Sequence, residues 1–126
     1  MRHLSAILAL WAGITACAQA AEPITLGLNY PRTGPYKEEG LAQMRGALLA
    51  IDEINAAGGV LGRPLRLSSK DTASRPAKAE KNVDKLAAEG AAMLFGGSSS
   101  AVAIAAGKRA KQSNQSNRSS PPTSSS

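Results

Sequence analysis

The feature that most constrains the fold is a regular alternation between short apolar runs and longer segments with helical spacing. The apolar runs span residues 24–29, 65–71 and 91–95, and the helical segments span residues 38–57, 76–89 and about 99–112. This alternation predicts a β-α-β-α-β-α order, because parallel strands need right-handed crossover helices between them. We therefore expect an α/β fold with a parallel sheet and helices on its faces.

The helical segments have apolar residues three or four positions apart, so each is expected to bury one face. In the first segment that face comprises Leu41, Met44, Leu48 and Ile51, and in the second it comprises Ala79, Val83 and Leu86.

The polarity of the strands predicts their order. LRLSSKD (residues 65–71) has polar residues on one side, as expected of an edge strand, whereas AAMLF (91–95) is apolar throughout and is expected to be central. A polar second strand at the edge favours the order 2-1-3. The ends of strands one and three then flank a topological switch point, where open α/β sheets bind ligands.

Residues 1–20 have the pattern of a secretory signal peptide, with a basic start, an apolar run and Ala18-Gln19-Ala20 as the cleavage motif. Cleavage before Ala21 would export the rest of the chain. The residues up to Cys17 also resemble a bacterial lipobox, so a lipoprotein anchored through Cys17 is the alternative.

The rest of the chain offers few chemical groups for catalysis. The only cysteine and the only histidine, His3, both lie within the first twenty residues, so thiol and histidine catalysis are not expected after cleavage. The net charge of +6 arises mainly outside residues 21–107, and aromatic residues make up only 3% of the chain. Nucleic-acid binding is therefore not expected, since it requires clustered basic and aromatic side chains.

The end of the chain changes in character after Gln112. SNQSNRSSPPTSSS (residues 113–126) contains no apolar residue and is expected to be a disordered, serine-rich tail. We accordingly divide the chain into a signal peptide (1–20), an α/β domain (21–112) and this tail (113–126).

Two glycines and three serines follow the third strand in the stretch FGGSSS, and they could serve several purposes. A nucleophile elbow would need glycine at Ser100 and a histidine base, and a phosphate-binding P-loop would need glycine at Val102. Two interpretations remain open together. The serines could cap the following helix, or they could bind an anion such as a carboxylate at its N-terminus.

Four stretches, in this order and spacing, resemble a known family. They are PRTGPYKEEG, AIDEINAAGGVLGRPLRL, KDTASRPAKAEKNVDKLAAEG and LFGGSSSAVAIAAGK, and the resemblance as a whole extends over about residues 24–112. They resemble the start of the type I periplasmic solute-binding proteins of branched-chain amino-acid ABC transporters. EINAAGGVLGRPL is the most characteristic phrase.

The resemblance implies a fold, a ligand and a location. The family has two Rossmann-like lobes that close over a ligand, and this chain would form part of the N-terminal lobe. It implies that Ser98, Ser99 and Ser100 bind the carboxylate of an amino acid or amide, and that Tyr36 lines the pocket. The partner would be an ABC permease in the inner membrane, with the binding protein in the periplasm. Neither enzymatic activity nor a metal or other cofactor is expected.

Two departures from the family pattern accompany the resemblance. Arg75 occupies a position where members often have aspartate, so Ser74 is expected to cap the next helix instead. The family-like pattern also stops near Gln112, although members have several hundred residues. We interpret the chain as a truncated fragment, produced by a frameshift or by an abnormal truncation near Gln112. A ligand-sensing periplasmic domain of a receptor or regulator is the alternative function.

Overall fold

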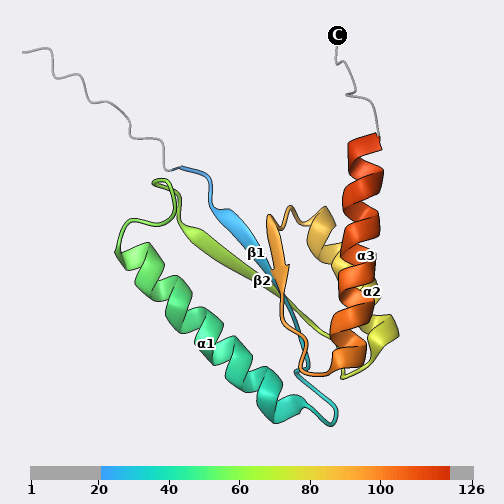
Figure 1. Ribbon diagram of the computed structural model, residues 1–126. Coiled ribbons are helices and arrows are strands. Elements are labelled where there is room, and N and C mark those ends of the chain that lie inside the picture. The colour runs from blue at the N-terminus through green and yellow to red at the C-terminus, as the bar shows by residue number, and fades with distance from the viewer. Residues whose placement is uncertain (1–20, 120–126) are drawn as a thin grey trace, which may run out of the picture.

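Strands and helices alternate in the predicted order in the part of the chain that the structure describes. The computed structural model describes residues 21–119. Its elements are β1 (Ile24–Tyr30), α1 (Lys37–Ala56), β2 (Leu65–Asp71), α2 (Pro76–Ala88), β3 (Met93–Phe95) and α3 (Ser100–Ser119) (Figure 1). The predicted signal peptide, the lipidation of Cys17 and residues 120–126 of the predicted tail lie outside the described residues.

The three strands form a parallel sheet with the order β2-β1-β3, as predicted. Ile24 of β1 pairs with Leu65 of β2, and Leu26 pairs with Met93 of β3. The prediction that the third strand is central is wrong within residues 21–119. There β3 pairs only with β1 and lies at the edge of the sheet, and Met93 is 55% exposed.

Helix α1 lies on one face of the sheet, and α2 and α3 pack together on the other (Figure 1). The predicted buried face of α2 is confirmed, since Ala79, Val83 and Leu86 are all buried. Burying a Val or Leu side chain of this kind contributes about 1.5–3 kcal/mol. The predicted face of α1 is only partly buried. Ile51 is enclosed, but Leu48 is 46% exposed.

A buried chain of amides joins two strands to α2. The Asn29 side chain donates to the carbonyl oxygen of Ala79 at 2.9 Å. Asn82 Nδ2 donates to Asn29 Oδ1 and to the carbonyl oxygen of Asp71, both at 3.0 Å. Because buried polar groups are costly unless they are paired, this network fixes the carboxyl ends of β1 and β2 relative to α2.

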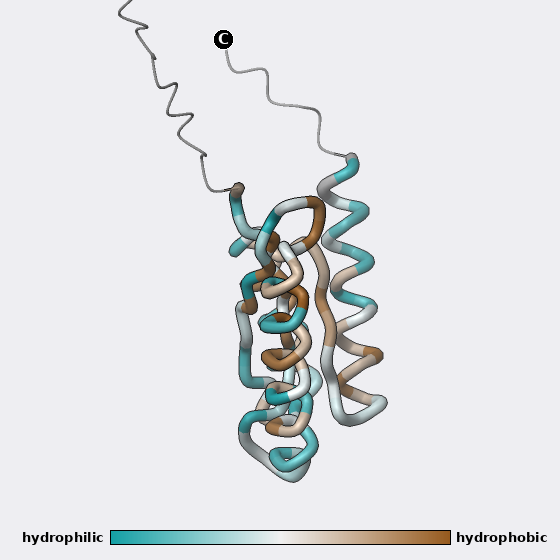
Figure 2. The backbone as a smooth tube through the Cα atoms, turned by 90° about the vertical axis from the view of Figure 1, so that its left-hand side faces the viewer, coloured by the Kyte–Doolittle hydropathy of each residue, from teal (hydrophilic) through white to brown (hydrophobic). Residues whose placement is uncertain are grey.

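Helix α3 continues beyond its predicted end at Gln112. It extends to Ser119, so the prediction of disorder is wrong for residues 113–119. Figure 2 shows that α3 is hydrophobic in its first turns and hydrophilic later. The helix is held on α2 by Arg109, which donates to both carboxylate oxygens of Asp84 at 2.7 and 3.0 Å. Once a helix is nucleated and docked, Ser and Asn extend it at a small cost per residue.

The structure contains no candidate for a membrane span within residues 21–119. None of the helices described there combines the length and the apolar character that crossing a bilayer requires.

Candidate ligand-binding site

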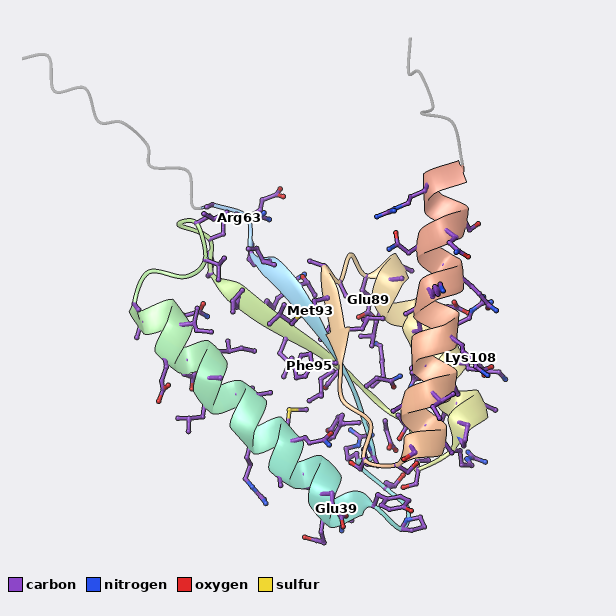
Figure 3. All side chains as sticks on the ribbon, in the orientation of Figure 1. Glu39, Arg63, Glu89, Met93, Phe95 and Lys108 are labelled. Carbon is purple, nitrogen blue, oxygen red and sulfur yellow. The ribbon has the colours of Figure 1, made fainter. Side chains whose placement is uncertain are left out.

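The loops that follow the three strands lie at the same end of the sheet. There β1 leads into α1, β2 into α2 and β3 into α3, so the N-termini of all three helices gather at this end (Figure 1). Figure 3 shows Glu39 of the first turn of α1 at this end and Arg63, which precedes β2, at the opposite end. This carboxyl end of the sheet is where open α/β folds bind ligands.

The serine loop, residues 96–100, connects β3 to α3. Gly96 and Gly97 have φ angles of 110° and 99°, a region that glycine adopts without steric cost. Ser99 precedes the first residue of α3, and its hydroxyl accepts a hydrogen bond from the Val102 amide at 3.3 Å. Ser99 is therefore the N-cap of α3. Ser98 is half-buried, whereas Ser100 is exposed.

A residue of α1, which lies on the face of the sheet opposite to α3, forms a hydrogen bond with Ser98. The side-chain amide of Gln43 donates from Nε2 to Ser98 Oγ at 3.1 Å, in a partly buried position. The other end of that amide, Oε1, is buried and has no hydrogen-bond partner within the described residues. The hydroxyl of Ser98 thus accepts a hydrogen bond from the protein and retains its own hydrogen as a donor.

Tyr36 lies at the same end of the sheet, in the loop between β1 and α1. It is the residue before the first helical position, and 40% of its surface is exposed. Its backbone amide donates to Ser74 Oγ at 3.2 Å, and the Ser74 hydroxyl donates to the carbonyl oxygen of Thr33 at 3.2 Å. Ser74 thus joins the loop after β2 to the loop after β1.

The prediction that Ser74 caps α2 is wrong. The N-cap position is occupied by Arg75, which makes no capping hydrogen bond through its side chain. Ser74 instead has a φ of 56°, and its hydroxyl points to the loop that carries Tyr36. Pro76 begins the helix, and it has no N–H group that would need a cap.

Asp71 at the end of β2 binds the same loop. Its carboxylate accepts hydrogen bonds from the amide of Arg32 at 2.9 Å, from the Thr33 hydroxyl at 2.7 Å and from the Ala73 amide at 2.8 Å. Burial raises the pKa of this carboxyl, but the hydrogen bonds from Ala73, Thr33 and Arg32 together outweigh burial and lower the pKa to about 2. Asp71 is therefore ionised and holds the loop before Tyr36 in place.

We expect Asp71 to make the fold sensitive to acid. Its folded pKa of about 2 lies below the ordinary value of 3.8. Its contribution to the free energy of unfolding is therefore complete above about pH 4 and is lost as the pH falls toward 2. The loss should be about 2 kcal/mol in the free energy of unfolding, since one pKa unit corresponds to about 1.4 kcal/mol. Urea unfolding between pH 2 and pH 5 would measure it. The Asp71→Asn variant should show a shallower decline, and an identical decline in both proteins would contradict this assignment.

The site therefore combines hydrogen-bond donors with the start of a long helix. A helix N-terminus carries partial positive charge and attracts carboxylates and phosphates. The serine hydroxyls add donors, and the glycines let the loop pack closely against the end of β1 and the start of α3. Within the part of the chain that is described, there is no group of three or more His, Cys, Asp or Glu side chains placed to bind a metal ion. The arrangement is suited to binding an anion.

Sequence reasoning proposed the serine loop and Tyr36 as site residues and did not single out Gln43 or Asp71. Gln43 is a polar residue beside the predicted apolar face of α1, and its polarity at that position was a signal. Asp71 is the last residue of the predicted second strand, at the carboxyl end of the sheet. The hydrogen bonds that join these residues to other elements reach partners 38 or more positions away in the sequence, so helical or strand periodicity does not reveal them.

Comparison with relatives places these features in a family. Residues 23–122 match the model of a family described as periplasmic binding protein. The Leu/Ile/Val-binding protein BraC3 of Rhizobium johnstonii is 36% identical over 95 residues, which cover 75% of this chain and 26% of that protein. A Leu, Ile, Val, Thr and Ala-binding protein of Pseudomonas aeruginosa is 38% identical over 85 residues, which cover 68% of this chain and 23% of that protein.

Solved structures agree with the sequence matches. The closed Leu, Ile, Val, Thr and Ala-binding protein of Brucella ovis gives a TM-score of 0.72 at 32% identity, covering 78% of this chain and 25% of that one. The substrate-binding protein LivJ of Streptococcus pneumoniae, in complex with isoleucine, gives a TM-score of 0.69 at 33% identity. The match covers 71% of this chain and 26% of that one. The chain spans about a quarter of the length of these relatives. By its sequence and by its fold, the chain belongs to the periplasmic binding protein family.

Proposed function

We propose that this chain contributes the carboxylate-binding wall of a solute-binding site, without carrying out a chemical step. The observation that carries the proposal is the serine loop, which presents Ser98 and Ser99 at the N-terminus of α3 and at the carboxyl end of the sheet. The ligand would be a branched-chain amino acid, as in the names of the relatives, or else a related amide. Because the relatives are about four times longer, we assign only this wall to the described residues.

The three predicted serines would have different roles at this wall. Ser99 is the N-cap and already accepts a hydrogen bond from the Val102 amide, so it stabilises the N-terminus of α3. Ser98 accepts from Gln43 and keeps its hydrogen available, so it would donate to the ligand carboxylate. Ser100 is exposed and begins α3, so we assign it the more peripheral contact. Tyr36 would line the pocket from the neighbouring loop, since 40% of the residue's surface is exposed.

The biological context follows from the same proposal. Family membership implies a periplasmic location, and residues 1–20 would direct export. The partner of the whole protein would be the permease of an ABC transporter, since LivJ is a transporter substrate-binding protein.

Binding of L-leucine to the full chain tests this function. The amide NMR signals of Gly97, Ser98 and Ser99 should shift during a titration, with an affinity in the millimolar range. The Ser98→Ala variant should bind at least about tenfold more weakly, because a hydrogen bond to a charged group contributes about 1.5–3 kcal/mol. Ser69→Ala, the same change on the edge strand β2, is the matched control and should bind like the parent. Absence of leucine-dependent shifts in the parent protein would refute the function.

A further inference from the structure

We infer that Gln43 is a positioning residue that sets Ser98 as a hydrogen-bond donor toward the bound carboxylate. The inference rests on the proposed function and extends it to α1, which lies on the opposite face of the sheet from α3. The connection is the hydrogen bond from Gln43 Nε2 to Ser98 Oγ at 3.1 Å.

The direction of this hydrogen bond determines what Ser98 can bind. A hydroxyl has one donor and two acceptor positions, whereas an ionised carboxylate only accepts. If the hydroxyl donated to the protein, its lone pairs would face the carboxylate and repel it. Because Gln43 donates to Ser98, the serine hydrogen is not used by this contact and can be directed at the ligand.

The arrangement is not the one that stability alone would favour. The Gln43 amide leaves Oε1 buried and without a partner in the part of the chain described here. An unpaired buried oxygen is unfavourable, and an apolar residue of similar size would avoid it. Features that break a packing rule in this way are expected at functional sites. Gln43 is also the residue that joins α1 to the serine loop by a side-chain hydrogen bond.

Two substitutions at Gln43 distinguish the direction of its hydrogen bond to Ser98 from the mere presence of that bond. In Gln43→Met the chain length is kept but the donor is lost, so Ser98 is free to rotate. In Gln43→Glu the carboxylate accepts from Ser98, so the bond is reversed and the hydroxyl hydrogen is withdrawn from the ligand. Acidification protonates the introduced Glu, which then can donate to Ser98 again.

The experiment is an NMR titration of the full chain with L-leucine at several pH values between 4 and 7. The affinity of each variant is divided by that of the parent at the same pH, which cancels the pH effects that are common to both proteins. We expect about a threefold weakening for Gln43→Met at every pH. For Gln43→Glu we expect at least tenfold weakening at pH 7 that returns toward the parent value at pH 4.

The outcomes separate the two proposals. If leucine binds the parent and both variants equally, the positioning role is wrong and the proposed function stands. If leucine does not bind the parent, both are wrong. A loss in Gln43→Glu that does not change with pH would indicate a purely structural role and would also overturn the inference. If the Gln43→Glu variant does not fold, the Gln43→Met variant decides. Equal binding of leucine by Gln43→Met and the parent would overturn the positioning role of Gln43, and a threefold weaker affinity would support it.

Discussion

Gly40→Ala is expected to destabilise the protein by at least about 3 kcal/mol, near or beyond the upper range for overpacking of a tight site. A Cβ atom at Gly40 would overlap the carbonyl oxygen of Pro31, and it would also lie 2.9 Å from the Pro31 ring. Pro31 is fully buried and directly follows β1, so neither backbone can move without displacing the helix from the sheet. The free energy of unfolding in urea measures the effect.

Gly46→Ala is the matched control, since it makes the same change two turns later in the same helix. Within residues 21–119, no atom beyond its chain neighbours and the local helix backbone lies within 4 Å of a Cβ atom built at Gly46. Alanine is favoured over glycine in a helix by up to about 1 kcal/mol, so this variant should be slightly more stable than the parent. Equal effects of the two substitutions would show that α1 does not approach Pro31 as closely as described.

The second large effect is expected for Gly96→Ala, at the start of the serine loop. Its φ of 110° disfavours a side chain, and the new Cβ atom would overlap the carbonyl oxygen of Asn29 at the end of β1. Strain and overlap together should lower the free energy of unfolding by about 3 kcal/mol. Because the loop must shift to accommodate alanine, the leucine-dependent NMR shifts of Ser98 and Ser99 should also weaken.

Gly90→Ala separates these two causes. Gly90 also has a positive φ, of 80°, but no atom of the described residues other than its chain neighbours lies within 4 Å of its added Cβ. Only the conformational strain of about 1–2 kcal/mol is therefore expected there. A Gly96→Ala variant that lost no more stability than Gly90→Ala would contradict the close approach of the serine loop to β1.

Much of the fold could be predicted because it depends on local patterns. The spacing of Ala79, Val83 and Leu86 predicted the buried face of α2, and the polarity of LRLSSKD predicted an edge position for β2. The capping role of a serine followed from the well-known preference of helix starts, and the structure assigns it to Ser99.

The remaining features depend on contacts between distant parts of the chain. The Gln43–Ser98 hydrogen bond spans 55 positions, and no local pattern encodes it. Ser74 was expected to serve its own helix, but its hydroxyl binds the loop that follows β1 instead. Residues 113–119 have a composition typical of disorder, yet they continue a helix whose earlier turns are docked on α2. In each case tertiary packing outweighs the local preference.

The central place of β1 also has a consequence for the order of events during synthesis. β1 is the first strand to be made, but its partners begin at Leu65 and Met93, so no strand pair can form from neighbouring residues. Closing such long loops costs entropy before any pairing is gained, which slows folding. At a translation rate of about 5–20 residues per second, β3 is completed on the order of 4–14 seconds after β1 begins to be made. The serine loop and the end of β1 therefore come together only after nearly the whole described chain exists.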